Sequence, residues 1–201
     1  MIQQGHVVLP HGAALVRLAP ASRSCFVAGT AILMADGRTR PIEAVRPGDH
    51  VIGRRGRPNR VMASLRARLG QRRLYGLNDG QPFVTVDHPF LTTEGWKALD
   101  PVATRSRHPG LQLEALQLGD RLCRGTMFSP SLWHGRVPVT EGLLFVQGTA
   151  ELVSIEAVDA DPGTHLFDLV LDGDHGYVAD GWIVCGRGGE EEAIRSGRDR
   201  P

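Results

Sequence analysis

The sequence has few of the features that mark several large classes of protein. Its three cysteines, Cys25, Cys123 and Cys185, are too few and odd in number for a disulfide scaffold, and no Cys-x-x-Cys pair suggests a zinc site. No stretch approaches the ~20 apolar residues of a membrane span, and the N-terminus lacks the charged-then-apolar order of a signal peptide. The formal net charge is only +1, so nucleic acid is not favoured as a partner. We therefore expect a soluble protein without metal, cofactor or membrane partner; its compartment is open, with the cytoplasm as the default.

One segment departs from this balance of charge. Residues 50–78 contain eight arginines and no aspartate or glutamate. Within it, Arg66 and Arg68 alternate with apolar residues such as Leu65 and Leu69, as on the polar side of a strand that faces water. A patch that binds a polyanion is the alternative interpretation, and the alternation makes us favour the strand.

Also missing is any long segment with the 3.6-residue apolar stripe of a helix. Period-2 alternation recurs instead, interrupted about every ten residues by Gly-bearing turn signals. Examples are Asp36-Gly37, Glu94-Gly95 and Asp180-Gly181, in which Gly supplies the positive φ that a tight turn needs. The sequence therefore predicts an all-β domain of many short strands.

The chain contains an internal repeat. Residues 42–51 match residues 113–122 in pattern, with an apolar-Glu-Ala-apolar run, a Gly-Asp turn and then a strand, at an offset of 71 residues. A second pair of turn glycines, Gly37 and Gly95, lies upstream at an offset of 58, so the second copy carries 13 more residues. These fall in the Pro-, Arg- and Ser-rich segment 100–112, where we expect a loop. Two aligned landmarks in order indicate duplication, and they predict a β domain with a pseudo-two-fold repeat.

Three blocks of the sequence resemble, in order, those of Hint (Hedgehog/intein-type) autoprocessing domains. The first is Cys25-Phe26-Val27-Ala28-Gly29-Thr30-Ala31-Ile32 with the turns that follow it. The second, Thr85-Val86-Asp87-His88-Pro89, is similar to the family's TxxH block. The third covers residues 167–181 and contains an aromatic-Asp-Leu strand and a His-x-aromatic turn. The resemblance implies the Hint fold, whose two pseudo-symmetric β halves agree with the repeat.

The resemblance also divides the chain into three parts. Residues 1–24 correspond to an extein-like N-terminal flank, and residues 25–186 to the Hint domain. Residues 187–201 are charged, Gly-bearing and almost free of apolar side chains. That composition predicts a disordered tail.

The activity that the resemblance implies is an N-to-S acyl shift. Cys25 attacks the carbonyl before it and turns the Ser24-Cys25 amide into a thioester. This needs a thiolate, donors for the oxyanion and an acid for the departing amine. By resemblance, Thr85 and His88 polarise and strain the scissile bond and His88 protonates its nitrogen, while Asp168 holds or deprotonates the thiol. A spacing of three residues on an extended segment or turn lets Thr85 and His88 reach one peptide.

Each of these residues also has a structural interpretation. Cys25 stands in an apolar run that is typical of a buried core thiol, and Thr85, His88 and Asp168 taken singly fit a strand or a turn. Their occurrence together is better explained by one site. For His175, which assists the C-terminal step in the family, a relic and a hydrogen-bonded structural role are equally open.

The end of the last block departs from the family. Splicing inteins end in His-Asn, where the Asn cyclises to cut the C-terminal junction, whereas this chain has Val184-Cys185-Gly186-Arg187. Complete splicing by the standard route is therefore not expected, and the thioester would pass to water, a free thiol or another small nucleophile. Hedgehog-type domains also lack the Asn and have a cysteine near this strand. The last 15 residues leave no room for a sterol-recognition region, so cholesterol is not favoured as the acceptor.

Cys185 has two interpretations. A bridge to Cys25 would lock the nucleophile in a disulfide and make cleavage depend on reduction, provided that the two Cα atoms lie about 4.4 to 6.8 Å apart. Packing as a small apolar residue is the interpretation that we favour.

The leading hypothesis is an autocatalytic, single-turnover cysteine domain that acts in cis on its own N-terminal flank. The alternative is a Hint-like structural or interaction module that does not cleave. A trans-acting cysteine hydrolase built on Cys25 and His88 is a distant third, because no substrate-pocket motif is present.

Overall fold

Strands make up nearly all of the regular secondary structure in the described part of the chain, with only a five-residue helix and one 3-10 turn beside them, which confirms the predicted all-β class. A computed structural model describes residues 25–106, 108, 110–128 and 144–188, so the N-terminal flank 1–24 lies outside the described residues. In this part of the chain, no helix is long and apolar enough to span a membrane. The elements in chain order are β1 (Phe26–Val27), β2 (Ala31–Leu33), β3 (Thr39–Pro41), the 3-10 helix η1 (Ile42–Ala44), β4 (His50–Ile52), β5 (Pro58–Arg68), β6 (Leu74–Leu77), β7 (Phe90–Thr92), β8 (Gly95–Ala98), α1 (Pro101–Arg105), β9 (Leu113–Ala115), β10 (Arg121–Phe128), β11 (Leu144–Glu151), β12 (Ile155–Val158), β13 (His165–Leu171), β14 (Gly176–Ala179), β15 (Trp182–Cys185) and β16 (Arg187–Gly188).

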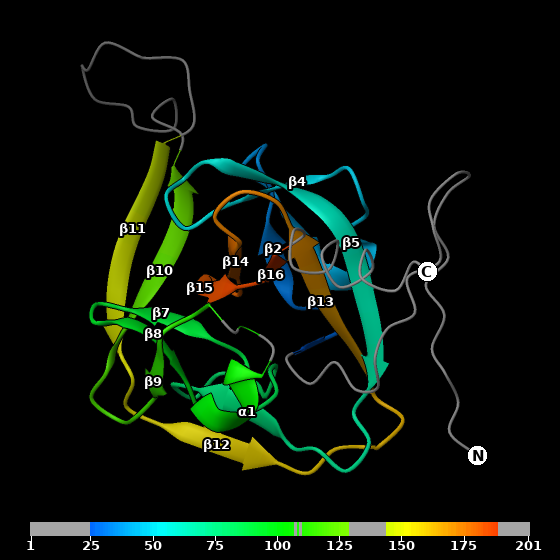
Figure 1. Cartoon of the computed structure of the whole chain (residues 1–201), viewed down its shortest axis with the longest axis vertical. Coiled ribbons are helices and arrows are strands. Elements are labelled where there is room, and N and C mark those ends of the chain that lie inside the picture. Colours follow the sequence, from blue (N-terminus) through cyan, green and yellow to red (C-terminus); the bar gives the residue numbers. More distant parts are fainter. Residues whose placement is uncertain (1–24, 107, 109, 129–143, 189–201) are drawn as a thin grey trace, which may run out of the picture.

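Two sheets hold most of the described strands. One has the order β1-β13-β5-β4, with β16 added beside β13. The other has the order β3-β2-β14-β15-β10-β7-β8-β9, with β11 added on β10, and a small third sheet pairs β12 with β6. Figure 1 shows the long β5–β13 pair on one side of the molecule and the β10–β11 hairpin on the other, with β14 and β15 between them.

The internal repeat of the sequence corresponds to two matching substructures. In each copy, a Gly-Asp turn precedes a strand that pairs with the next, β4 with β5 and β10 with β11. The Asp49 carboxylate accepts the backbone N–H of Arg46 at 2.7 Å, and Asp120 accepts that of Gln117 at 2.8 Å. The glycine before each aspartate has a φ of 92°, in the left-handed region that favours glycine. The predicted pseudo-two-fold repeat is therefore confirmed.

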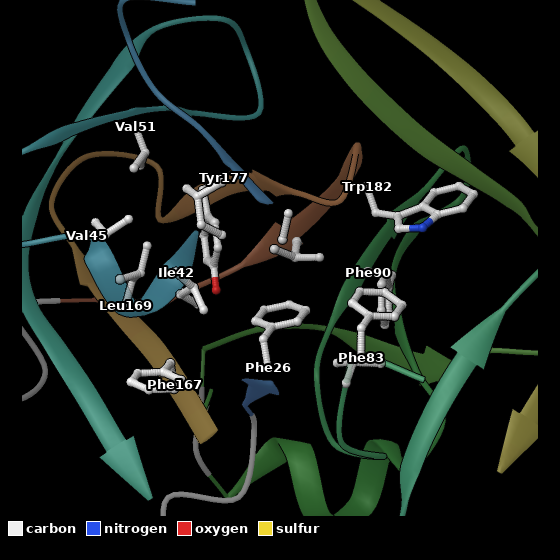
Figure 2. Close-up of a cluster of buried hydrophobic side chains, with 14 of the residues drawn as sticks. Phe26, Ile42, Val45, Val51, Phe83, Phe90, Phe167, Leu169, Tyr177 and Trp182 are labelled. Atoms are coloured by element: carbon white, nitrogen blue, oxygen red, sulfur yellow. The ribbon is translucent and has the colours of Figure 1, made fainter. Parts of the chain in front are cut away.

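A cluster of buried apolar side chains joins the two large sheets. Phe26 is fully buried within it, stacked on Phe83 at 5.7 Å between ring centroids and edge-on to Tyr177 at 6.2 Å. Figure 2 shows Phe26 between Phe83 and Phe90 on one side and Ile42 and Tyr177 on the other. Burial of one such side chain contributes about 1.5–3 kcal/mol. The cluster therefore fixes the backbone on both sides of Phe26.

The segment 100–112, expected as a loop, contains the five-residue helix α1. The Asp100 carboxylate caps it by accepting the N–H of Ala103 at 2.9 Å, and Pro101 stands in its first turn, where its missing N–H does no harm. The prediction of a loop is wrong for residues 101–105, because a helix this short shows no apolar stripe. Residues 107 and 109 lie outside the described residues.

Strand β5 confirms the interpretation of the arginine-rich segment. Arg66 and Arg68 are exposed, whereas Leu65 and Leu69 are buried. The Arg66 guanidinium lies over the Phe167 ring, 5.5 Å from its centroid. These arginines therefore form the polar side of a half-buried strand.

A short strand lies just beyond residue 186, where the Hint domain was expected to end. Strand β16 runs parallel to β13 and pairs Arg187 with Val170. Arg187 and Gly188, which were expected to belong to the tail, thus form a strand, and a two-residue pairing leaves no signal in composition. Residues 189–201 lie outside the described residues.

Candidate active site

Cys25 lies directly before β1 and is held by Thr85. The backbone N–H of Cys25 donates to the Thr85 hydroxyl at 2.9 Å, and the Thr85 N–H donates to the Cys25 carbonyl oxygen at 3.0 Å. The hydroxyl also donates to that carbonyl oxygen at 3.3 Å. The nitrogen of Cys25 belongs to the Ser24-Cys25 peptide bond, although Ser24 itself lies outside the described residues. Thr85 therefore contacts the bond that the sequence analysis identifies as scissile.

Thr85 and His88 begin and end a tight turn that leads into β7. The N–H of His88 donates to the Thr85 carbonyl oxygen at 3.3 Å. The His88 ring is fully buried and packs on Phe26, with 4.2 Å between ring centroids. Neither ring nitrogen has a hydrogen-bond partner among the described residues. Packing against Phe26 therefore positions the His88 ring, and neither ring nitrogen is used in a hydrogen bond within the described part of the chain.

Asp168 reaches His88 from the middle of β13. Its Oδ1 lies 3.8 Å from Nε2 of His88, close enough for an ion pair when the imidazole is protonated. The same oxygen accepts the Leu169 N–H at 2.8 Å and the Tyr177 hydroxyl at 3.3 Å. The side chain is 1% exposed, so these contacts replace the solvent that would otherwise stabilise a carboxylate.

Tyr177 donates to Asp168 from β14, and no role was assigned to it from the sequence. Burial raises the pKa of its hydroxyl well above the usual value, and the Asp168 charge, with smaller effects from the thiols of Cys25 and Cys185, raises it further. Tyr177 therefore remains protonated and donates to Asp168. Cys25 and Cys185 are both buried. No disulfide links them, and Cys123 is also a thiol.

Asp87 is a second buried carboxyl that the sequence analysis did not assign a role. It stands inside the TxxH block and is 1% exposed. Burial raises its pKa above the usual value, while the Thr85 hydroxyl and the positive charges of His88 and Arg72 lower it in part. Its position in the block was visible in the sequence, but its burial was not.

His175 is engaged in the turn before β14. It has a φ of 57°, and its Nδ1 lies 3.1 Å from the carbonyl oxygen of Leu171. Its own carbonyl accepts the N–H of Gly186 at 2.7 Å. Two roles were considered for His175, a relic of the C-terminal step and a hydrogen-bonded structural residue. These contacts favour the structural role. Among the described residues, no three His, Cys, Asp or Glu side chains gather as a metal site.

A continuous series of contacts thus connects the residues singled out from the sequence, from Cys25 through Thr85 and His88 to Asp168. Each of these side chains is at most 1% exposed. A thiol, an imidazole and a buried carboxyl are the groups that acyl transfer from nitrogen to sulfur requires.

Comparisons with known proteins show what parts of this chain resemble. A family model described as Hom_end-associated Hint matches residues 25–81. Three curated relatives are iron-sulfur cluster assembly SufBD family proteins, one from Mycobacterium bovis and two from strains of Mycobacterium tuberculosis. Each is 36% identical over 102 residues, which covers 42% of this chain and 12% of the relative. The chain therefore matches only a small part of these longer proteins.

Solved structures of inteins share the fold. A mutant of the Ssp DnaB mini-intein matches with a TM-score of 0.54 at 20% identity, covering 81% of this chain and 98% of that one. The gp41-1 intein matches with a TM-score of 0.50 at 17% identity, covering 82% and 100%. A bacterial intein-like domain from Clostridium thermocellum matches with a TM-score of 0.50 at 22% identity, covering 81% and 98%. At these identities the likeness is one of fold.

Proposed function

We propose that this chain, which shares the fold of inteins and matches a Hint family model over residues 25–81, cleaves the peptide bond between Ser24 and Cys25. The reaction is an N-to-S acyl shift that acts once per molecule, in cis, and releases the N-terminal flank from a thioester. The observation that carries the proposal is the 2.9 Å hydrogen bond from the Cys25 N–H to the Thr85 hydroxyl. That bond holds the Thr85 hydroxyl against the Cys25 nitrogen, which is the leaving group of the reaction.

The step balances with the groups at hand. A lone pair of the Cys25 sulfur forms the bond to the carbonyl carbon of Ser24, and the thiol proton passes to Asp168. The C–N bond breaks, its electron pair stays on nitrogen, and protonated His88 donates the proton that completes the amine. Asp168 then returns its proton to His88, whose Nε2 lies 3.8 Å from Oδ1, so that no net proton is consumed. Water or a small thiol then attacks the thioester.

Burial of the site supports this chemistry. Cys25, Thr85, His88 and Asp168 are each at most 1% exposed. Charges interact more strongly where water is excluded. The protonated Tyr177 donates to Asp168 at 3.3 Å and keeps the carboxylate in place.

The proposal stops at N-terminal cleavage because of Gly186, which stands where splicing inteins have their terminal Asn. A Cβ atom at this position would lie 2.9 Å from the Leu169 carbonyl oxygen and 3.1 Å from a ring carbon of Tyr177. A side chain at residue 186 therefore requires the backbone of β13 to shift. The absence of an Asn and the lack of space for one both favour a reaction that stops at cleavage of the N-terminal junction.

Intact mass spectrometry of the full chain tests the proposal. Incubation with a strong thiol or hydroxylamine should yield a fragment that begins at Cys25, and Cys25→Ala should abolish it. Cys123→Ala is the matched control, since Cys123 is also buried but belongs to a different apolar cluster. Cleavage that persists in Cys25→Ala indicates ordinary proteolysis of the flank. A parent chain that stays intact supports the non-cleaving structural or interaction module instead.

A further inference from the structure

Arg187 reaches the site from beyond the segment that resembles the family. It lies on β16, and the parallel pairing of this strand with β13 sets Arg187 opposite Val170, two residues from Asp168. Its Nε lies 3.7 Å from Oδ2 of Asp168, and the two side chains are 15% and 1% exposed. The distance and the burial identify an ion pair that is largely shielded from solvent.

The two oxygens of the Asp168 carboxylate have different neighbours, and Arg187 lies beside Oδ2. On Oδ1, the Leu169 N–H and the Tyr177 hydroxyl donate, and His88 lies within 3.8 Å. Across the sheet, β5 sets the apolar Leu65 opposite Asp168. Oδ2 has no hydrogen-bond partner among the described residues, and the Arg187 guanidinium faces it.

The charges that face this carboxylate differ in kind. Tyr177 is neutral, the nearby thiols of Cys25 and Cys185 become negative when they ionise, and His88 gains or loses its proton during the reaction. The Arg187 guanidinium carries a positive charge at every working pH. It therefore supplies a counter-charge that does not change as the reaction proceeds.

We propose that Arg187 is a positioning residue for the acyl shift, which holds Asp168 as a carboxylate with Oδ1 turned toward His88 and Tyr177. A buried carboxyl without a counter-charge favours its neutral form. Neutral Asp168 can neither accept the thiol proton nor stabilise a protonated His88. The inference rests on the proposed function and assigns part of the site to the chain after Gly186. N-terminal cleavage therefore depends on a residue at the C-terminal end of the fold.

The rate of thiol-induced cleavage in Arg187 variants tests the inference. Arg187→Gln should slow cleavage at neutral pH by about tenfold or more, and the acid limb of the rate-pH profile should move up by about one unit. Arg187→Lys keeps the charge and should restore most of the rate. Arg66→Gln is the matched control, because it removes an arginine that contacts Phe167, the neighbour of Asp168, on the exposed side of β5.

The outcomes separate the inference from the proposed function. If the parent cleaves and Arg187→Gln matches Arg66→Gln in rate and in profile, the positioning role is wrong. If the parent does not cleave, the proposed function fails, and carbon-13 NMR of the Asp168 carboxyl decides the inference without any reaction. The Asp168 signal should then report protonation at a higher pH in Arg187→Gln than in Arg66→Gln, and equal titrations overturn the inference.

Discussion

The Thr85 hydroxyl holds the nitrogen that leaves in the proposed reaction, and Thr85→Ala removes it. Thr85 is 1% exposed, so water has little access to the Cys25 N–H that loses its partner. A buried donor left without a partner costs about 1–3 kcal/mol. If the hydroxyl stabilises the transition state by that much more than it stabilises the intact peptide bond, its loss makes cleavage about 5- to 150-fold slower. Thr85→Ser keeps the hydroxyl and removes one buried methyl group, worth about 0.8 kcal/mol.

Two measurements separate an effect on the reaction from an effect on the fold. The first is the rate constant for the appearance of the Cys25 fragment in excess thiol, followed by intact mass. The second is the free energy of unfolding, from urea denaturation followed by circular dichroism. Thr85→Ala should lower both, and Thr85→Ser should lower only the free energy of unfolding, and slightly. Equal cleavage rates in the two variants would refute a role of the hydroxyl in the reaction, because the hydrogen bond would then serve only the fold.

Three further predictions concern residues around the site. Burial raises the pKa of folded Asp87, so its contribution to stability is full below its ordinary pKa of 3.8 and is lost as the pH rises through the folded value. Urea denaturation at several pH values should therefore show Asp87→Asn gaining stability relative to the parent as the pH rises, and a difference that does not vary with pH contradicts this. Gly186→Asn should lower the free energy of unfolding by about 1–3 kcal/mol, because its Cβ would meet the Leu169 carbonyl oxygen at 2.9 Å. A stable Gly186→Asn variant that cuts at the C-terminal end of the domain, detected by mass, speaks against this account. Cys185→Ala should show the same dependence on reductant as the parent, since the structure holds Cys25 and Cys185 as thiols; cleavage that requires reductant only in the parent would reveal a bridge between them.

Turn chemistry and alternation explain why the fold class could be predicted from the sequence. The predicted turn glycines Gly37, Gly95 and Gly181 have φ values of 80°, 128° and 79°, which only a residue without a Cβ adopts readily. The repeat was visible because its turns depend on local hydrogen bonds, such as that from Arg46 to Asp49. Helix α1 was missed because its signals are confined to its first turn, the cap at Asp100 and the proline that follows it.

The candidate site could be predicted only where the family motif names its residues. Cys25 and Thr85 are 60 residues apart in sequence, and their hydrogen bond exists because β1 and the turn before β7 meet in the folded domain. Asp87, Tyr177 and Arg187 escaped notice because their importance comes from burial and from neighbours on other strands. In the sequence, Arg187 looked like part of a charged tail. Its partner Asp168 is 19 residues away and lies beside it only because β16 pairs with β13.

The placement of these residues makes the proposed reaction depend on completion of the fold. The nucleophile comes from the first described residue, Thr85 and His88 from the turn between β6 and β7, and Asp168 from β13. Phe26 packs against His88 at 4.2 Å and pairs with Phe167, the neighbour of Asp168. A chain in which β13 has not paired with β1 and β5, and β16 has not paired with β13, therefore has the thiol but neither the carboxylate nor its counter-charge. Since an amide resists attack without both a base and an acid, the Ser24-Cys25 bond should survive until the last strands are in place.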